Sequence, residues 1–329
     1  YIMRSDSSGM AFVQALSRAQ ERGVEIRVLI DGVGEWYSWP RIGKKLADAG
    51  IPFARFLPPK LIPPTIRLNL RNHRKLLIVD GHTAFTGGMN IDQAHAATKA
   101  KPASIRDHHF QLTGPIARQL EDVFWEDWVF ATQESRPAPL PTTKQLQNLR
   151  CRTITDGPGE DLDKLLLIIN AVIATARDSV WIVTPYFLPP RELLTAIQIA
   201  ALRGAEISIL LPAKNNLPFV HWASRNMLWE VLQWGAKVYY QAGPFVHSKL
   251  LVVDDHYVQI GSANLDARSL RLNFEVAVEI IDQNFARSLV HDLRSAREAA
   301  IPVNLKELDE RSFWTKLRDG IAWLGSPYL

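Results

Sequence analysis

Two patterns of apolar and polar residues follow one another along the chain, and both occur twice. In ALSRAQERGVEIRVLIDGVG, apolar residues recur at helical spacing until a turn at Gly23, and a short apolar run follows. AIQIAALRGAEISILLPAKN has the same order, with its turn at Gly204. Helical spacing predicts an amphipathic helix, and a short apolar run predicts a buried strand. We therefore expect a helix and then a strand in each of two repeated halves.

The repetition continues through the rest of each half. KKLADAGIPFARF and EVLQWGAKVYYQA each predict a helix, a turn at Gly50 or Gly235, and a strand. Both halves then have two apolar strands joined by a tight turn, at Asp80–Gly81 or Asp254–Asp255, and end with one more strand and a helix. Helices that alternate with apolar strands indicate the α/β class. We expect two repeated α/β/α halves with mixed, mostly parallel sheets.

The repeat and the composition divide the chain into four segments. These are a first half, a linker rich in proline and glycine, a second half and an amphipathic tail, at 1–135, 136–160, 161–300 and 301–329. The second half opens with a helix near Leu162 to Ala176 and the strand VWIVTPYFLPP, and its Tyr186 aligns with Tyr1. The first half lacks a matching helix and most of a matching strand. We expect both to lie upstream of Tyr1, where a membrane anchor would also belong.

Each half carries the same polar motif on its predicted pair of strands. The motif reads His-x-Lys, four residues, Asp, and then Gly-x-x-Asn. Its residues are His73, Lys75, Asp80, Gly87 and Asn90 in the first half, and His247, Lys249, Asp254, Gly261 and Asn264 in the second. Residues two apart on a strand point to the same face, so each histidine projects together with its lysine. The two aspartates have the opposite parity, and we expect them to be structural.

These residue types predict chemistry on a phosphodiester. A histidine titrates near neutral pH, so one ring can attack phosphorus while the other donates a proton to the leaving alcohol. Ammonium and amide groups stabilise the charge that develops on the phosphoryl oxygens. A lysine beside each histidine disfavours a cation, and we expect neither a metal ion nor a cofactor. Asp107 and Glu275 occupy matching places on the next strand and are candidates to orient the histidines; ordinary strand-end carboxylates are the alternative.

The duplicated motif resembles that of the phospholipase D superfamily. Together with TPYFLPP, GSANLDARSLRLNFE and RDHHFQLTGPIA, it makes nearly the whole chain similar to bacterial cardiolipin synthases. The resemblance implies two halves packed about a pseudo-two-fold axis with both motifs at one site, His73 as the nucleophile and His247 as the general acid. It also implies transfer of a phosphatidyl group from one phosphatidylglycerol to another. One departure is Gly88, which stands where the second half has Ser262, so only the second half offers a hydroxyl contact.

Composition narrows the classes of partner. The chain has 329 residues, 47% of them hydrophobic, with a formal net charge of +4 and a pI of about 9.1. These values exclude a disordered chain and are compatible with an anionic lipid surface or with nucleic acid. The single cysteine, Cys151, excludes a disulfide framework and a cysteine metal site. No run of about 18 apolar residues occurs, so no membrane-spanning helix is predicted.

A lipid-using enzyme without a spanning helix needs a surface that contacts the membrane. The candidates are the tail, the proline-rich segment before the first motif and an aromatic loop. The residues of the segment and the loop are Lys60, Arg67, Arg71, Trp36 and Trp39. Loops packed on the protein are the alternative for the segment and the loop. His221 is a candidate for the substrate pocket, and an ordinary surface or core histidine is the alternative. We expect phosphatidylglycerol and a membrane surface as partners, no nucleic acid, and a location at the bacterial cytoplasmic membrane, peripheral or anchored by an upstream segment.

Three other functions are alternatives. A phospholipase D that hydrolyses lipids to phosphatidic acid needs the same residues, because only the acceptor differs. A phosphodiesterase acting on nucleic acid needs a basic groove with stacking aromatics, whereas the tryptophans here are scattered. A catalytically inactive membrane scaffold has no need of two intact polar motifs. The oligomeric state is open.

Overall fold

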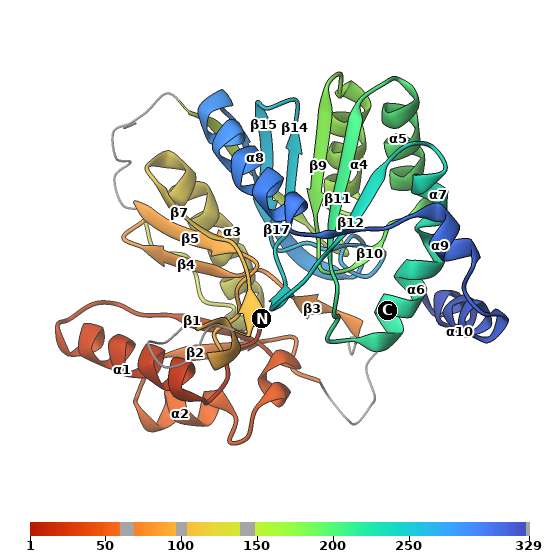
Figure 1. Ribbon diagram of the computed structural model, residues 1–329. Coiled ribbons are helices and arrows are strands. Elements are labelled where there is room, and N and C mark those ends of the chain that lie inside the picture. The colour runs from red at the N-terminus through yellow and green to blue at the C-terminus, as the bar shows by residue number, and fades with distance from the viewer. Residues whose placement is uncertain (60–68, 97–103, 139–148, 327–329) are drawn as a thin grey trace. The chain divides into compact units, whose positions relative to one another are not determined.

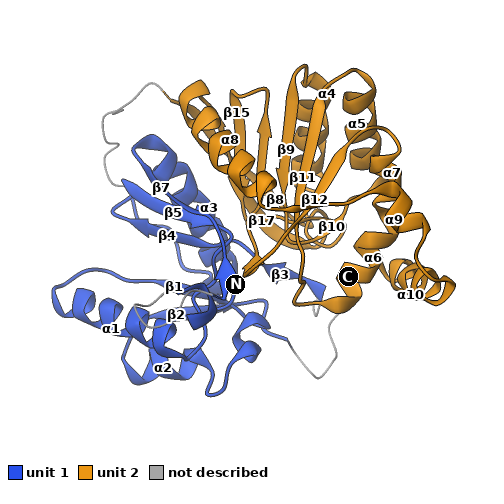
Figure 2. Cartoon of the chain, in the orientation of Figure 1, with its two compact units in different colours: residues 1–146 blue, residues 147–329 orange. Residues whose placement is uncertain are grey.

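The computed structural model describes residues 1–59, 69–96, 104–138 and 149–326 (Figure 1). The chain divides into two compact units, unit 1 at 1–146 and unit 2 at 147–329 (Figure 2). Each unit contains one copy of the repeat. Among the described residues, no helix is both long enough and apolar enough to cross a membrane.

Unit 2 is built on a mixed sheet with helices on both faces. Its strands follow the order β18-β12-β11-β9-β14-β15-β17, and β8 also pairs with β17. Their bounds are Arg150–Asp156 for β8, Ser179–Val183 for β9, Glu206–Pro212 for β11, Lys237–Gln241 for β12, Leu250–Val253 for β14, Tyr257–Gly261 for β15, Asn273–Ile281 for β17 and Ile301–Pro302 for β18. Helices α4 (Lys164–Thr175) and α5 (Arg191–Leu202) lie behind this sheet in Figure 1, and α8 (Gln283–Glu298) lies in front. Because both faces are covered, β9 and β14 are buried almost throughout.

The shorter elements of unit 2 connect the ends of these strands. They are β10 (Phe187–Leu188), α6 (Pro218–Met227), α7 (Trp229–Leu232), β13 (Phe245–Val246), β16 (Leu265–Asp266), α9 (Leu305–Asp309) and α10 (Phe313–Leu324). β10 pairs in parallel with β16, and α10 packs against α6. The apolar residues of α4, α5, β9 and β11 form one large core, which includes Ile169, Ile182, Ile197 and Ile209.

Unit 1 repeats the order that unit 2 follows from α5 onward, but its longer strands form two small sheets. β1 (Val28–Asp31) pairs in parallel with β2 (Phe53–Phe56). The second sheet is antiparallel and consists of β4 (Leu76–Val79), β5 (Thr83–Gly87) and β7 (His109–Thr113). The other elements are α1 (Ser7–Glu21), η1 (Gly34–Tyr37), α2 (Ile42–Asp48), β3 (Arg71–Asn72), η3 (Gln93–His95), β6 (Ile105–Arg106) and α3 (Pro115–Thr132). α1 and α2 enclose a core with β1, and α3 packs on β2 and β4.

The directions of the strands correct one prediction. The sheets are mixed, as expected, and β11 runs parallel to β9 and β12. However, β14 is antiparallel to β9 and β15, and β17 is antiparallel to β15 and β8, so the sheets are not mostly parallel. Each motif lies on a hairpin, and two strands joined by a two-residue turn must run antiparallel.

The hairpin turns lie where the sequence predicts them. Asp80 and Gly81 have φ angles of 54° and 61°, and Asp254 and Asp255 have φ angles of 50° and 52°. Two successive residues with positive φ match the right-handed twist of paired strands, and aspartate and glycine tolerate this conformation better than most residues. The hairpin prediction is therefore confirmed in both units.

The predicted linker is shorter than expected. β8 lies inside 136–160, where it pairs with β17 over its whole length. Burial increases along this strand, from the exposed Arg150 and Arg152 to the buried Ile154 and Asp156. The prolines and glycines on both sides of the strand indicated a linker and concealed it.

Candidate active site

In unit 2, the motif histidine and lysine form a close pair at the start of β14. His247 follows β13, and Lys249 directly precedes β14, which fixes both side chains on one face. The Lys249 ammonium donates to the backbone oxygen of His247 and lies 3.0 Å from Nδ1 and 3.1 Å from Nε2 of the same ring. Both residues are buried. A cation and a titratable ring are thus held together, as the two-residue spacing predicts.

Glu275, the candidate orienting residue of unit 2, is itself held by two side chains. The Ser262 hydroxyl donates to Oε2 of Glu275, and the Asn273 amide donates to Oε1 over 3.0 Å. The same hydroxyl accepts the Val276 backbone N–H at 3.0 Å. Glu275 is completely buried on β17. Ser262, the residue after the motif glycine, therefore fixes this carboxylate.

The motif asparagine of unit 2 lies in a buried polar turn. Asn264 donates to the Ser269 hydroxyl over 3.1 Å, and Asp266 accepts the Ser269 backbone N–H at 2.7 Å. Burial raises the pKa of Asp266 to about 6, and the nearby charge of Glu275 acts in the same direction. Among the described residues, the buried Oδ1 of Asn264 has no hydrogen-bond partner, and the same is true of Asn90 in unit 1. Buried polar atoms without partners are unusual in folded proteins and are typical of ligand sites.

In unit 1, the motif pair has the same arrangement. The Lys75 ammonium donates to the backbone oxygen of His73 over 2.7 Å, as Lys249 does to His247. The ring of Tyr1 lies edge-on to the His73 ring with 4.8 Å between centroids, and the Lys75 ammonium lies 5.3 Å from the Tyr1 ring. Both units therefore tie the lysine to the main chain of its own histidine.

Two buried aspartates hold the residues on either side of His73. Asp127 accepts the Asn72 amide and the Arg74 guanidinium, each at 2.8 Å. Asp31 accepts the Asn72 backbone N–H at 2.8 Å. Burial raises the pKa of Asp127, and it also raises that of Asp31, although backbone N–H groups oppose the shift. The motif gives no sign of either aspartate, because they come from the end of β1 and from α3.

Asp107, the candidate orienting residue of unit 1, fills the space next to Gly88. A Cβ atom at Gly88 would lie 2.6 Å from Oδ2 of Asp107 and closer still to Oδ1. The glycine that replaces Ser262 is thus required by the position of the carboxylate. His95 lies on the other side, with Nε2 at 3.7 Å from Asp107 and Nδ1 at 3.2 Å from Asp92. Burial lowers the pKa of His95, but the two carboxylates outweigh it and raise that pKa above its usual value.

His95 and Asp92 are site residues that the sequence analysis did not single out. A signal was present, because Asn90-x-Asp92-x-x-His95 has the same spacing as Asn264-x-Asp266-x-x-Ser269. In both units the aspartate accepts the backbone N–H of the residue three positions later, at 3.3 Å in unit 1 and 2.7 Å in unit 2.

The glycines and aspartates of the motif have structural positions. A Cβ atom at Gly261 would lie 2.5 Å from the Val276 oxygen, and one at Gly87 would lie 2.9 Å from the His109 Cα, because the next strand passes close by. Asp254 accepts the backbone N–H groups of three successive residues at 2.8 to 2.9 Å, namely Arg177, Asp178 and Ser179. These hydrogen bonds lower the pKa of Asp254, although partial burial opposes them.

Comparison with known proteins decides the family. The family model described as cardiolipin synthase, phospholipase D-like domain, matches residues 1–128 and 169–296. The chain belongs to this family. It is 34% identical to the major cardiolipin synthase ClsA of Bacillus subtilis and 33% identical to cardiolipin synthase A of Pseudomonas putida, in each case over its whole length. It spans 69% and 68% of those proteins, and other cardiolipin synthases are matched over 65% to 66% of their length.

The fold of this cardiolipin synthase family member also matches a solved structure. The crystal structure of phosphatidylserine synthase from Haemophilus influenzae superposes with a TM-score of 0.73, covering 99% of this chain and 88% of that one, at 17% identity. At this identity the likeness concerns the fold alone. The predicted resemblance to the phospholipase D superfamily is confirmed, and so is the mixed α/β class.

The residues predicted to contact lipid have different surroundings. Trp36 and Trp39 are exposed, to 47% and 87%. Arg71 is half-buried and donates to the Leu70 oxygen over 2.9 Å. Lys60 and Arg67 lie outside the described residues. His221 lies half-buried on α6 with its ring 5.7 Å from that of Tyr240, and its place in a substrate pocket stays a prediction.

Proposed function

We propose that this chain makes cardiolipin from two phosphatidylglycerol molecules, through a covalent phosphohistidine and without a metal ion or cofactor. The observation that carries the proposal is the paired geometry in a cardiolipin synthase family member. Each unit presents a histidine whose lysine is tied to the histidine's own backbone oxygen. The relatives named cardiolipin synthases support this reaction over hydrolysis.

In the proposed reaction, His73 attacks phosphorus of the first phosphatidylglycerol. A P–N bond forms, the bond from phosphorus to the headgroup glycerol breaks, and His247 donates a proton to the departing glycerol. A hydroxyl of the second phosphatidylglycerol then loses its proton to His247 and attacks phosphorus, which breaks the P–N bond. Lys75 and Lys249 stabilise the negative charge on the phosphoryl oxygens, as do the amides of Asn90 and Asn264.

Asp107 and Glu275 are proposed to orient the reacting histidine rings by accepting a ring N–H. Glu275 is suited to this task because Ser262 and Asn273 fix both of its oxygens. Asp107 is suited to it because Gly88 leaves space for its carboxylate, and Oδ1 of that carboxylate accepts the His108 backbone N–H at 2.8 Å. A carboxylate fixed in this way selects one tautomer of its histidine.

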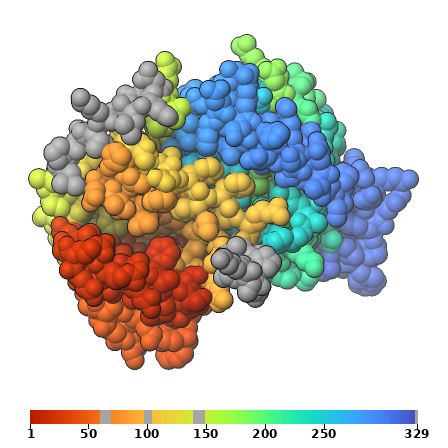
Figure 3. Space-filling model, turned by 60° about the vertical axis from the view of Figure 1, so that its left-hand side comes forward, coloured from red at the N-terminus to blue at the C-terminus, as the bar shows by residue number. Residues whose placement is uncertain are grey.

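A membrane surface is the proposed site of action, and α10 is the proposed point of contact. Arg225 and Arg311 donate to the buried Asp319, which holds α10 against α6. The opposite side of α10 exposes Phe313 and Trp314, to 69% and 75%. This C-terminal part, dark blue in Figure 3, projects from unit 2. Exposed aromatic and aliphatic side chains on an amphipathic helix are typical of the membrane interface.

The Trp314→Ser variant tests this contact. We expect it to lose binding to lipid vesicles, measured by sedimentation, and unchanged binding would contradict the proposal. In this proposal the enzyme is peripheral to the bacterial cytoplasmic membrane, or anchored there by an upstream segment.

Labelled phosphatidylglycerol in mixed micelles with EDTA tests the reaction. Cardiolipin and glycerol are the expected products. Phosphatidic acid alone would identify a hydrolase, and cleavage of a DNA oligonucleotide without lipid turnover would identify a phosphodiesterase.

His73→Ala and His247→Ala should each lower turnover by about a thousandfold or more. His291→Ala, at an exposed position on α8, is the matched control and should retain full activity. Near-normal turnover in either motif variant would contradict the mechanism, and a trapped phosphohistidine would identify the nucleophile.

A further inference from the structure

Three arginines of unit 2 donate to one carboxylate. Arg225 of α6 donates to Asp319 of α10 over 2.7 and 3.0 Å, and Arg318 donates to it over 2.8 and 3.1 Å. Arg311, which lies between α9 and α10, also donates to it. The Asp319 side chain is completely buried, whereas the arginine side chains are between 17% and 42% exposed. We call Arg225, Arg311 and Arg318 the arginine cluster.

One carboxylate does not neutralise the arginine cluster. Where an arginine has a buried carboxylate to itself, as Arg55 has Glu35, the hydrogen bond raises the pKa of the guanidinium. The pKa of Arg311 is instead lowered, because burial and the charge of Arg225 outweigh the carboxylates near it. The cluster therefore has more positive charge than the carboxylate that it binds can offset.

His221 gives a second sign of this positive charge. It lies on α6, one turn before Arg225. Burial lowers the pKa of His221, and the charges of Arg225 and Arg318 act in the same direction, whereas Asp319 opposes them. A histidine beside the cluster thus resists protonation, and an anion bound there would reverse that effect.

The guanidinium groups of the cluster also keep donors that Asp319 does not use. Its two oxygens already accept five hydrogen bonds, against about four lone-pair positions on a carboxylate. In the part of the chain that the structure describes, no acceptor is bonded to Nη1 of Arg225, Nη2 of Arg311 or Nη1 of Arg318. Guanidinium groups bind phosphate oxygens through such N–H donors, so a phosphate group matches both the charge and the donors.

The helix surface next to the cluster is apolar. The exposed apolar residues of α10 recur at helical spacing and are Trp314, Leu317, Ile321 and Leu324. Arg318 is four residues after Trp314 and three before Ile321, so it borders this stripe, and its guanidinium lies 4.5 Å from the Trp222 ring centroid. Neither a free phosphate ion nor a nucleic acid accounts for an exposed aliphatic stripe. A phospholipid does, because it has an anionic phosphate above hydrocarbon chains.

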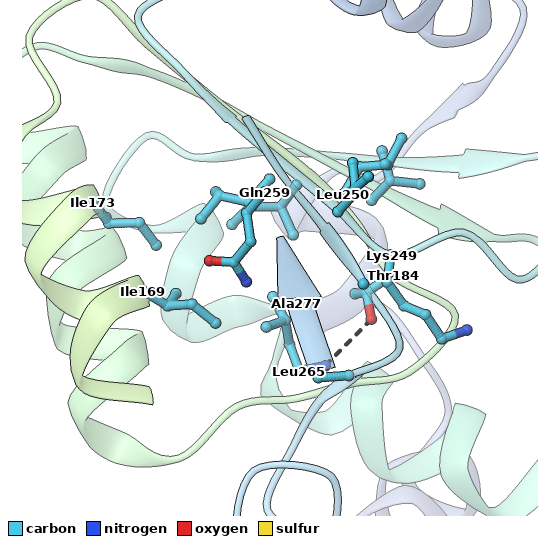
Figure 4. A pocket seen from close by; sticks show the side chains of 14 residues that line it. Ile169, Ile173, Thr184, Lys249, Leu250, Gln259, Leu265 and Ala277 are labelled. Carbon is cyan, nitrogen blue, oxygen red and sulfur yellow. Dashed lines mark hydrogen bonds between the residues drawn. The ribbon is translucent and has the colours of Figure 1, made fainter. Parts of the chain in front are cut away.

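A cavity beside the motif of unit 2 is too small for such a group. It borders Lys249 and has a volume of about 20 Å³, enough for one water molecule. Figure 4 shows Ile169 and Ile173 of α4 on one side of this cavity, and Lys249 and Thr184 on the other. The arginine cluster is partly exposed at the surface and is not limited in this way.

We infer that the arginine cluster binds the phosphodiester of an anionic phospholipid in the membrane surface, while the apolar stripe of α10 inserts among the acyl chains beside it. This inference deepens the proposed membrane contact of α10 and rests on that contact. The cluster belongs to α6, to α10 and to the residues just before α10, none of which carries a motif residue. The lipid bound there is therefore held at the membrane and is not the lipid that reacts.

Sedimentation with lipid vesicles measures the contribution of the cluster. The original chain should bind vesicles that contain phosphatidylglycerol more tightly than vesicles of phosphatidylcholine alone. Arg318→Gln should weaken binding to the phosphatidylglycerol vesicles by about fivefold, the effect of one basic residue near an anionic surface. Arg225 and Arg311 still hold Asp319 in this variant, so α10 should stay in place. Arg294→Gln, at an exposed position on α8, is the matched control and should bind like the original chain.

The His221 ring reports binding at the cluster itself. Short-chain phosphatidylglycerol should raise the pKa of His221, because a bound anion offsets the charges of Arg225 and Arg318. Short-chain phosphatidylcholine should leave this pKa unchanged. Inorganic phosphate should raise it only at concentrations about a hundredfold higher, because it has no chains for α10 to contact. Titration of the imidazole signals by NMR measures all three.

The inference fails if Arg318→Gln binds phosphatidylglycerol vesicles as tightly as the original chain, if Arg294→Gln loses as much binding, or if the pKa of His221 does not respond to the lipid. A response to inorganic phosphate at the same concentration as the lipid would replace the lipid site with a free-phosphate site. A response to a DNA oligonucleotide but not to lipid would replace it with a nucleic-acid contact. His73→Ala, which should lack turnover, should still bind the vesicles, so the inference and the proposed reaction can fail separately.

Discussion

At the scale of single residues, the two units hold the carboxylate of their last strand in different ways. Unit 2 places a glutamate on its last strand and fixes it with Ser262. Unit 1 places Asp107, one methylene shorter, and its carboxylate occupies the space that a side chain at Gly88 would need. Each carboxylate is thus matched to the residue after the motif glycine, and the two solutions are not interchangeable one residue at a time.

Gly88→Ala and Gly88→Ser should lower turnover by about 10- to 100-fold, because a displacement of the Asp107 carboxylate by about 1 Å misaligns the histidine ring that we propose it orients. Both variants should behave alike, since the clash arises at Cβ and not at the hydroxyl. Gly159→Ala is the control, because a Cβ atom there meets nothing within 4 Å. Circular dichroism should show all three variants folded. Full activity in Gly88→Ala would exclude a role for the position of Asp107.

At the scale of elements, the hairpin turn connects the motif to the neighbouring strand. In unit 2 the turn places the Asp254 carboxylate on three successive backbone N–H groups, so the start of β9 is tied to the end of β14. β9 in turn borders the strand that begins next to Lys249. Asp254 therefore joins the strand that follows Lys249 to its neighbour in the sheet, which fits the structural role expected of the motif aspartate.

Asp254→Ala should lower the free energy of unfolding of unit 2 by about 2 kcal/mol, because three N–H groups lose a charged acceptor. Asp80→Ala should change the free energy of unfolding by less than about 0.5 kcal/mol.

The contribution of Asp254 should also depend on pH. Hydrogen bonds from backbone N–H groups hold the pKa of Asp254 below its usual range despite partial burial. The stabilisation is therefore present at neutral pH and is lost as the pH falls through that lowered pKa. Denaturant titrations at several pH values measure both effects; equal losses in the two variants would contradict the assignment.

At the scale of the whole molecule, the stability of unit 2 depends on buried carboxyl groups near Glu275. Asp156 pairs with Glu275 across β8 and β17 and accepts the Leu165 backbone N–H at 3.2 Å, at the start of α4. Burial raises the pKa of Asp156 from 3.8 to about 7, and the charge of Glu275 acts in the same direction. Asp266 shifts the same way, to about 6. Unit 2 thus concentrates acids that resist ionisation.

The stability of unit 2 should fall as the pH rises from about 4 to about 7. In this range the unfolded chain releases the Asp156 proton while the folded unit retains it, so the folded state binds more protons and loses stability with rising pH. Asp156→Asn keeps an oxygen for the Leu165 N–H and should reduce this slope. Thermal melts of the variant and of the original chain across the range measure the difference. Identical slopes would show that Asp156 ionises normally.

The sequence predicts the repeat, both hairpins and the pairing of each histidine with its lysine, because these depend on local periodicity and on a two-residue spacing. It does not predict the residues that support the site. Asp31, Asp127 and His95 come from separate elements, and only the folded chain brings them beside the motifs. The strand directions were also mispredicted, because apolar runs indicate buried strands without their orientation.

The exchange of a serine for a glycine has a consequence for the history of such a duplicated gene. In a unit with Asp107 and Gly88, a serine at position 88 would collide with the carboxylate. A return to the serine of the other unit therefore requires a change at position 107 as well. Once two copies differ at this pair, single mutations that restore the serine are disfavoured, and the two halves stay different.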